Sequence, residues 1–221
     1  MHKFNEAQMR NKPPIKWLLV DIGDVLLLKD RNADQTFTQL LANELRVDFE
    51  LAQKINHAHY STMDVAYIPE EDFVASLEKS LGYKAPTGIF SYFVRAYEKQ
   101  VRPNTELFHF LDEMRASGMK TAVLSNTIAI YRDIQKRMGI SKGNGFEPIL
   151  YSWEVGMLKP NKDMFELALQ KLQVKPDEII FIDDKLEHIH GAQRVGMRTI
   201  LFNNTESVIS QIRTLSQTNL T

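Results

Sequence analysis

Six polar residues in this sequence together supply the side chains that phosphoryl chemistry requires. They lie at the ends of short apolar runs or beside a predicted helix start, and they are Asp21, Ser125, Asn126, Lys159, Asp183 and Asp184. Carboxylates bind a hard cation such as Mg²⁺, and a carboxylate can attack phosphorus. A hydroxyl, an amide and an ammonium group can donate hydrogen bonds to phosphoryl oxygens. The pattern therefore predicts a site for a cation and a phosphoryl group.

Taken singly, each of these residues is weak evidence for a site. An Asp at a strand end is more often a turn or capping residue, and a lone Lys is usually a solvated surface charge. The adjacent pair Asp183 and Asp184 is more informative, because two carboxylates at a buried strand end repel each other unless a positive charge compensates. It is the joint pattern that favours function.

The elements that must position these residues are short runs that are apolar on both faces, as in a parallel sheet covered by helices. The predicted strands are Trp17 to Ile22, Lys120 to Ser125, Glu178 to Ile182, Arg198 to Phe202 and, more weakly, Pro148 to Trp153. Helical stripes such as Leu107, Leu111 and Met114 alternate with them, which predicts βαβ units. Ligands bind beyond the carboxyl ends of such strands, so the polar residues should meet at one edge of the sheet.

The interval from about Asp34 to Val101 breaks this alternation, because it contains several helical stripes and no strand pattern. We therefore predict an α/β fold, a Rossmann-like parallel sheet flanked by helices, with a helical cap inserted after the first strand. The expected division is an N-terminal extension at 1–14, a core at 15–30 and 102–221, and a cap at 31–101.

The amino-acid composition limits the classes of partner that the protein is expected to bind. The chain has 27 basic and 28 acidic side chains and a net charge of −1, so it has no long-range field that would favour nucleic acid or an anionic membrane. It has no cysteine, which excludes disulfides and thiolate zinc sites. We found no apolar run of transmembrane length and no signal-like start, and we expect a cytoplasmic, soluble protein of undetermined oligomeric state.

Four segments carry a family resemblance. In order, "LLVDIGDVL", "AVLSNT", "GMLKPNKDMFELAL" and "IIFIDDKLEHIHGAQRVGM" resemble the motifs of the haloacid dehalogenase-like hydrolase superfamily. The amino-acid sequences of these motifs are similar to those of capped phosphatases in the superfamily, namely sugar-phosphate phosphatases and the phosphatase domain of soluble epoxide hydrolases. The resemblance implies a Mg²⁺-dependent phosphomonoester hydrolase that acts on a small phosphorylated metabolite, such as a sugar phosphate.

The resemblance also implies a role for each matching residue. Asp21 would be the nucleophile that becomes an aspartyl phosphate, and Lys159 would orient it and neutralise phosphoryl charge. Ser125 and Asn126 would hold the phosphoryl oxygens. The ligands of Mg²⁺ would be the carboxylates of Asp21 and Asp184 and the backbone carbonyl of Gly23, with Asp183 as a supporting or alternative ligand.

One position departs from the family pattern. Most phosphatases of this family have an Asp at position 23 that protonates the leaving oxygen, and Gly23 has no side chain to do so. The next residue, Asp24, is one position late and is predicted to be a turn residue. We therefore expect a preference for leaving groups that need no proton.

In the motif "LEHIHG", His188 is expected to border the site, and His190 is expected on the surface.

Two other functions fit the same sequence. A metal-independent 2-haloacid dehalogenase would use Asp21 to attack carbon, but the acidic pair Asp183 and Asp184 would repel its carboxylate substrate. A non-catalytic phospholigand-binding relative would explain Gly23, but binding alone does not require Asp21 and Lys159 together.

Overall fold

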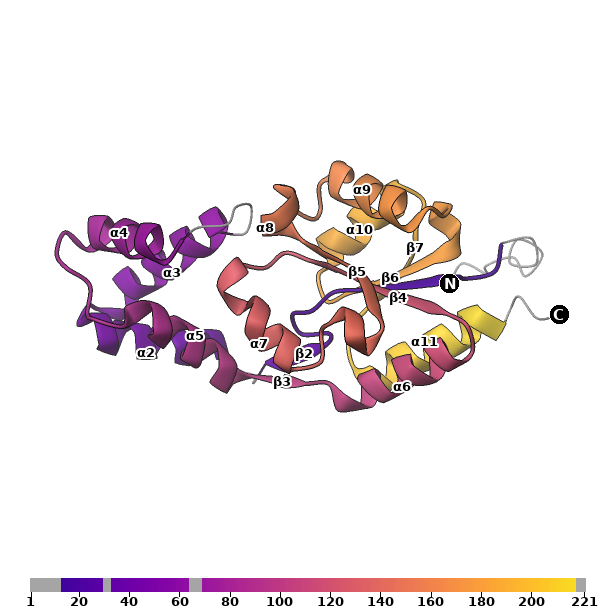
Figure 1. The fold of residues 1–221 in the computed structure, drawn as a ribbon, viewed down its shortest axis with the longest axis horizontal. Helices are drawn as coiled ribbons and strands as arrows, with labels where there is room; N and C mark the ends of the chain where they lie inside the picture. Colours follow the sequence, from indigo (N-terminus) through magenta and orange to yellow (C-terminus); the bar gives the residue numbers. More distant parts are fainter. Residues whose placement is uncertain (1–12, 30–32, 64–68, 218–221) are drawn as a thin grey trace, which may run out of the picture.

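The computed structural model describes residues 13–29, 33–63 and 69–217. It has an α/β core and a helical cap that lies beyond one end of the sheet (Figure 1). The predicted extension at 1–14 lies almost entirely outside the described residues. The fold predicted from the sequence is confirmed, with the differences given below.

A five-stranded parallel sheet forms the centre of the core, in the order β5-β4-β1-β6-β7. The strands are β1 (Trp17–Val20), β4 (Lys120–Ser125), β5 (Phe146–Tyr151), β6 (Ile179–Asp183) and β7 (Arg198–Leu201). All of the predicted strands are present, including the weaker one. The first strand is central, because β1 pairs with β4 on one side and with β6 on the other.

Helices cover both faces of the sheet (Figure 1). One face is covered by α6 (Thr105–Ala116) and α11 (Thr205–Gln217), and the other by α9 (Lys162–Leu172) and α10 (Leu186–Arg194). Alternate residues of β1 point to opposite faces of the sheet. Leu18 and Val20 pack in the hydrophobic cluster on the α6 and α11 side, and Leu19 packs in the cluster on the α9 and α10 side. Asn104 caps the start of α6, because its Oδ1 accepts a hydrogen bond of 3.3 Å from the Leu107 amide.

Shorter elements connect these layers. They are α7 (Arg132–Arg137), α8 (Ser152–Val155) and the 3₁₀ turns η1 (Ala129–Tyr131), η2 (Lys142–Asn144) and η3 (Pro176–Glu178).

The cap consists of α2 (Ala33–Leu45), α3 (Phe49–Met63), α4 (Glu70–Leu81) and α5 (Ile89–Gln100). Its helices share a hydrophobic cluster in which Phe73 and Phe93 pack edge to face, with ring centroids 5.1 Å apart. Tyr131 and Ile134 of the core belong to the same cluster. The segment η1–α7 therefore joins the cap to the core.

Two short strands at the base of the cap were not predicted. The strand β2 (Leu27–Lys29) pairs antiparallel with β3 (Val101–Pro103). The chain thus enters and leaves the cap through this ribbon rather than directly from β1. Strands this short show no hydrophobic period, so the sequence pattern could not reveal them. The residue limits of the cap remain a prediction.

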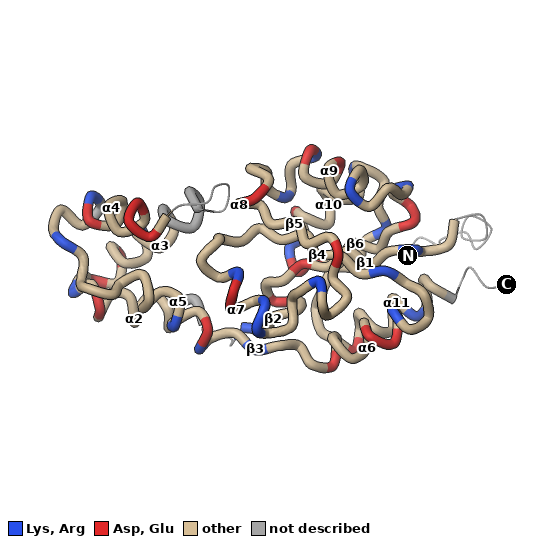
Figure 2. Tube along the Cα trace, in the orientation of Figure 1, with Lys and Arg blue, Asp and Glu red and all other residues tan. Residues whose placement is uncertain are grey.

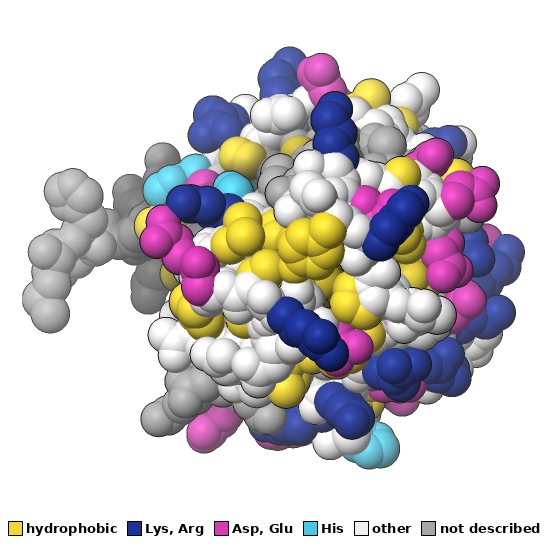
Figure 3. All heavy atoms as spheres, turned by 90° about the vertical axis from the view of Figure 1, so that its left-hand side faces the viewer, with side chains coloured by type: hydrophobic (Ala, Val, Ile, Leu, Met, Phe, Trp, Pro, Cys, Tyr) yellow, Lys and Arg dark blue, Asp and Glu magenta, His cyan; other side chains and the backbone are white. Residues whose placement is uncertain are grey.

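The surface has no dominant charge. Lys and Arg are interspersed with Asp and Glu along both core and cap (Figure 2). The cap end shows hydrophobic side chains gathered among charges of both signs (Figure 3). Exposed large hydrophobic residues of the cap include Leu40, Phe49 and Tyr83. Within the described ranges, no helix has the length and apolar character needed to cross a membrane.

Candidate active site

The strand order brings the predicted polar residues together. Asp21 directly follows the central strand β1, Ser125 ends β4 on one side, and Asp183 ends β6 on the other. Because all three strands are parallel, these residues lie at the same edge of the sheet. All three side chains are buried.

Lys159 is the centre of the site. Its ammonium group is buried and donates hydrogen bonds to Asp21 Oδ1 at 2.7 Å, Asp183 Oδ2 at 2.6 Å and the Leu124 carbonyl at 2.8 Å. Burial alone would lower the pKa of Lys159, but Asp21 and Asp183 together raise it above its ordinary value. This residue is therefore a fixed positive charge between two carboxylates, not the solvated surface charge that a lone Lys usually is.

Asn126 fixes the backbone of Lys159. Its amide group donates to the Lys159 carbonyl at 2.8 Å, and its carbonyl oxygen accepts from the Lys159 amide at 2.9 Å. Both polar atoms of the Asn126 side chain thus bond to the loop that carries Lys159. The phosphate-binding role expected for Asn126 would fall to its backbone N–H, and it remains a prediction.

Asp183 is fully buried, and several neighbouring groups bond to its carboxylate. It accepts from the Lys185 amide at 2.9 Å, and His188 Nδ1 lies 3.0 Å from its Oδ1. Burial alone would raise the pKa of Asp183, but Lys159 and His188 lower it to about 2. This geometry fits a role for Asp183 in holding Lys159 and His188 in place. It fits the role of a free metal ligand less well.

Asp184 is only partly buried and completes an acidic group. Ligand oxygens of Asp21, Asp183 and Asp184 lie within 4.8 Å of one another. Burial, followed by repulsion from Asp21 and Asp183, raises the pKa of Asp184 to about 6. The pKa of Asp21 is also raised, mainly by burial. Three carboxylates face one ammonium group, so the donor set fits a divalent cation with oxygen ligands.

Gly23 lies in the loop that follows Asp21. A Cβ added at Gly23 would meet only Asp21 Oδ2, at 3.9 Å, and Gly23 is not among the glycines with positive φ. The backbone at this position thus accepts a Cβ without a clash, close to Asp21.

The Asp24 carboxylate is paired with Lys29. Its φ is 55°, its Oδ1 accepts from the Lys29 amide at 3.1 Å, and its Oδ2 lies 3.8 Å from Lys29 Nζ. This agrees with the turn role predicted for Asp24 and does not make it a replacement for the missing acid.

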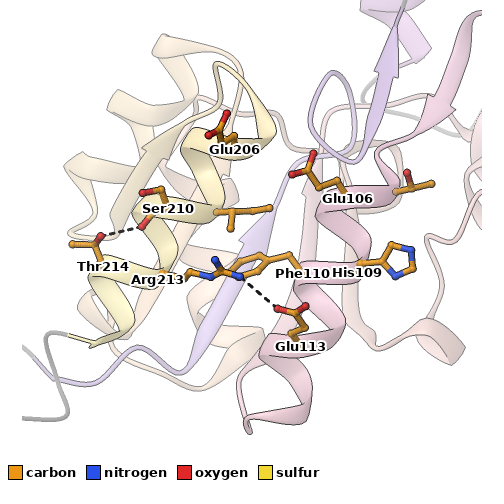
Figure 4. Close-up of a pocket in the computed structure, with 10 residues that line it drawn as sticks. Glu106, His109, Phe110, Glu113, Glu206, Ser210, Arg213 and Thr214 are labelled. Atoms are coloured by element: carbon orange, nitrogen blue, oxygen red, sulfur yellow. Dashed lines mark hydrogen bonds and ion pairs between the residues drawn. The ribbon is translucent and has the colours of Figure 1, made fainter.

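A cavity of about 590 Å³ lies between the site and the cap. Gly23 and Ser125 line it from the core, and Asn56 and Tyr97 line it from the cap. A larger groove, of about 880 Å³, follows α6 and α11 (Figure 4). That groove contains none of the strand-end residues, and in it Arg213 faces Glu113 at 3.7 Å.

Some residues lie closer to the site than the sequence indicated. His188 was expected only to border the site, yet it contacts Asp183 directly; its position in the first turn of α10 was the available signal. His190 is on the surface, as predicted. Tyr97 of the cap stacks on Tyr131 with ring centroids 3.7 Å apart and also lines the cavity. No local pattern pointed to Gln135, which lines the same cavity.

The fold and the site together define a class of protein: a capped Rossmann-like α/β protein with a buried Asp–Lys–Asp cluster at the carboxyl ends of its strands. A family model of the haloacid dehalogenase-like hydrolases matches residues 15–196. The chain therefore belongs to the haloacid dehalogenase-like hydrolase family, as its motifs predicted.

Two curated relatives illustrate the range of similarity. Bifunctional epoxide hydrolase 2 of Rattus norvegicus is 29% identical over 108 residues, which is 48% of this chain and 20% of that protein. Glyceraldehyde 3-phosphate phosphatase of Methanocaldococcus jannaschii is 24% identical over 195 residues, or 84% of each chain. The chain spans well under half the length of several other relatives.

Solved structures share the fold. A haloacid dehalogenase family enzyme of Bacteroides thetaiotaomicron, in complex with magnesium and inorganic phosphate, has a TM-score of 0.70 and 22% identity. The match covers 88% of this chain and 98% of that one.

Proposed function

We propose that this protein is a Mg²⁺-dependent phosphomonoester hydrolase that works through an aspartyl-phosphate intermediate. The observation that carries the proposal is the contact of Lys159 with Asp21 beside the further carboxylates of Asp183 and Asp184. The similarity to phosphatases and the magnesium and phosphate bound by a structural relative support it.

In the first step, Asp21 attacks phosphorus, the bond from phosphorus to the leaving oxygen breaks, and the leaving group departs with the electron pair. Lys159 holds Asp21 in position and balances negative charge on the phosphoryl oxygens, and the Ser125 hydroxyl donates to one of these oxygens. In the second step, water attacks the phosphorus of aspartyl phosphate. Inorganic phosphate leaves, and the Asp21 carboxylate is regenerated.

Asp21, Asp184 and the Gly23 carbonyl would hold Mg²⁺, with Asp183 supporting them through Lys159. The cation would supply positive charge for the phosphoryl group, which is its general contribution in such reactions. A panel of phosphorylated metabolites, assayed with and without Mg²⁺, tests the proposal. Turnover that requires Mg²⁺ supports it, and inactivity across the panel would favour the binding relative instead.

Magnesium binding should weaken in acid. A proton on Asp184, whose pKa is about 6, competes with the cation, so the apparent Mg²⁺ affinity should fall roughly tenfold per pH unit below that value. Because this pKa is raised in the folded protein, the proton stabilises the metal-free fold at low pH, and this contribution is lost as pH rises through about 6. Thermal unfolding should therefore show a larger Mg²⁺-induced rise in Tm at pH 7.5 than at pH 5.

Asp184→Asn is the control for this pH effect, because it removes the titrating group and one ligand. It should abolish most of the rise in Tm at both pH values. A rise in the wild type that is equal at pH 5 and pH 7.5 would contradict the assignment of Asp184 as a ligand.

Gly23→Asp should restore the missing acid. A Cβ at this position meets only Asp21 Oδ2, at 3.9 Å, which is an ordinary contact. We expect turnover of alkyl phosphates to rise about tenfold or more, since general acid catalysis is worth roughly 10²–10⁴ in rate. Acetyl phosphate, whose leaving group needs no proton, should change little. Steady-state kinetics on both substrates provide the measurement.

Gly23→Asn is the matched control, since it has the same size without the acid. An equal gain with Asn would show that the side chain acts by packing and not by proton transfer.

A dehalogenase function is the weaker alternative. Solved L-2-haloacid dehalogenases share the fold, with 16% and 17% identity, which says nothing about activity. The three neighbouring carboxylates oppose a carboxylate substrate. Chloride release from a 2-haloacid without Mg²⁺ would reverse this preference.

A further inference from the structure

We propose that the cavity between cap and core selects a leaving group that carries its own negative charge, as a carboxylate or a second phosphoryl group. Lys185 from the core and His57 from the cap would bind this charge. The inference rests on the proposed phosphatase function, and it adds the charge of the substrate and two specificity residues. Lys185 directly precedes α10, and His57 lies in α3.

The cavity is placed to receive the leaving group. Its lining includes Gly23 and Ser125, which border the position proposed for the phosphoryl group. Lys185 lines the cavity from the core, and His57 lines it from the cap. A volume of about 590 Å³ is in the range of small-molecule sites, so the cavity has room for more than the phosphoryl group.

The lining has basic side chains and lacks acidic ones. Among the described residues, Lys29, His57 and Lys185 line the cavity, and no Asp or Glu does. The whole chain has 27 basic and 28 acidic side chains, so this lining departs from the average charge of the protein. A positively charged group would find no counter-ion here. A negatively charged group is the ligand that this lining complements.

Lys185 is the charge that the protein leaves available for a ligand. Its side chain is exposed, and within the described ranges its ammonium group makes no hydrogen bond or ion pair. Its charge acts on the neighbouring Asp184, but no ion pair joins the two side chains. Lys29, by contrast, faces Asp24 at 3.8 Å. We therefore assign the anion to Lys185 in preference to Lys29.

His57 supplies a donor from the cap. Its side chain is exposed, and an imidazole ring has an N–H group whether or not it carries a charge. His57 can therefore donate a hydrogen bond to an anion in either state. The amide side chains of Gln53 and Asn56 line the same part of the cavity. An anion bound by His57 and Lys185 would connect the cap with the core.

A basic lining would also attract the phosphoryl group that is transferred. The two interpretations can be separated, because every substrate of a phosphatase carries that phosphoryl group and only some carry a second anion. Loss of Lys185 should affect all substrates equally under the first interpretation. Under our inference, it should affect mainly the substrates with a second anion.

The test compares para-carboxyphenyl phosphate with para-carbamoylphenyl phosphate, which has nearly the same shape without the second charge. The carbamoyl compound has the more acidic phenol, so leaving-group reactivity alone favours the neutral substrate. We expect wild type to prefer the carboxylate substrate about tenfold in kcat/KM, the size of one hydrogen bond to a charged group. Hydroquinone bisphosphate, assayed in parallel, shows whether a second phosphoryl group is accepted in place of the carboxylate.

Lys185→Met should lower kcat/KM about tenfold for the carboxylate substrate and less than about threefold for the carbamoyl substrate. Lys185→Arg keeps the charge and should retain the preference. His57→Leu should reduce the preference about threefold from the cap side. Lys136→Met is the matched control, because Lys136 is exposed on the core helix α7 and does not line the cavity. It should leave the preference unchanged.

A preference for the bisphosphate alone supports the inference and identifies the second anion as a phosphoryl group. An equal loss on the charged and neutral substrates in Lys185→Met, or no loss on either, overturns the inference. Equal use of all three substrates by wild type also overturns it but leaves the proposed function intact. Failure to hydrolyse any of the three in the presence of Mg²⁺ overturns the proposed function itself.

Discussion

Asp21→Asn is expected to reduce Mg²⁺-dependent turnover of acetyl phosphate by about 10⁴-fold or more, because no intermediate can form without the attacking carboxylate. Asn has nearly the same shape and can still accept a hydrogen bond from Lys159, which lies 2.7 Å from Oδ1 of the wild-type residue. Asp183 continues to balance the charge of Lys159. The loss should therefore appear in kcat while the fold is retained, as measured by circular dichroism and thermal unfolding.

Asp24→Asn is the matched control for Asp21→Asn. It makes the same chemical change three positions later, on a side chain that is 43% exposed and paired with Lys29. Turnover should stay within about threefold of wild type, since no role in proton transfer is assigned to it. Substantial activity in Asp21→Asn, or an equal loss in Asp24→Asn, would contradict the role given to Asp21.

Lys159→Met is expected to lower the free energy of unfolding by about 3–5 kcal/mol in the absence of Mg²⁺ and to abolish turnover. The substitution keeps the length of the side chain but leaves Asp21 and Asp183 buried without their shared counter-ion. The two carboxylates can relieve this repulsion by taking up protons. The loss of stability should therefore be larger at pH 8 than at pH 5, which urea unfolding at the two pH values will measure.

Lys162→Met is the control for this effect, since Lys162 lies three residues later and forms an exposed pair with Glu166. An exposed pair of this kind contributes about 0.3–0.5 kcal/mol, so this variant should unfold almost like wild type. Equal destabilisation by the two substitutions would show that the buried cluster does not have the energetic role assigned to Lys159.

The sequence predicted the parts of the site that depend on strand ends. Asp21, Ser125 and Asp183 each follow an apolar run, and parallel pairing alone brings such positions to one edge. Lys159 was included because it precedes a predicted helix start, and only the family resemblance implied that it would contact Asp21. No local pattern shows that a residue ahead of a helix will turn its side chain into a buried cluster.

Other features could not be predicted because they depend on tertiary contacts. Asn126 was expected to hold phosphoryl oxygens, and no local pattern indicated that its side chain would bond to the backbone of Lys159, a residue 33 positions away. Gln135 lies in a six-residue helix, α7, that is too short to show a clear period. Its function as part of a cavity wall emerges only when the cap packs on η1 and α7.

Chemical trapping of the intermediate tests the central claim most directly. Wild-type protein mixed with acetyl phosphate and Mg²⁺, and quenched in acid within milliseconds, should carry one phosphoryl group. Mass spectrometry should place this group on the peptide that contains Asp21, and Asp21→Asn should carry none. Turnover by wild type without a phosphoryl group on that peptide, or labelling that persists in Asp21→Asn, would contradict an aspartyl phosphate formed at Asp21.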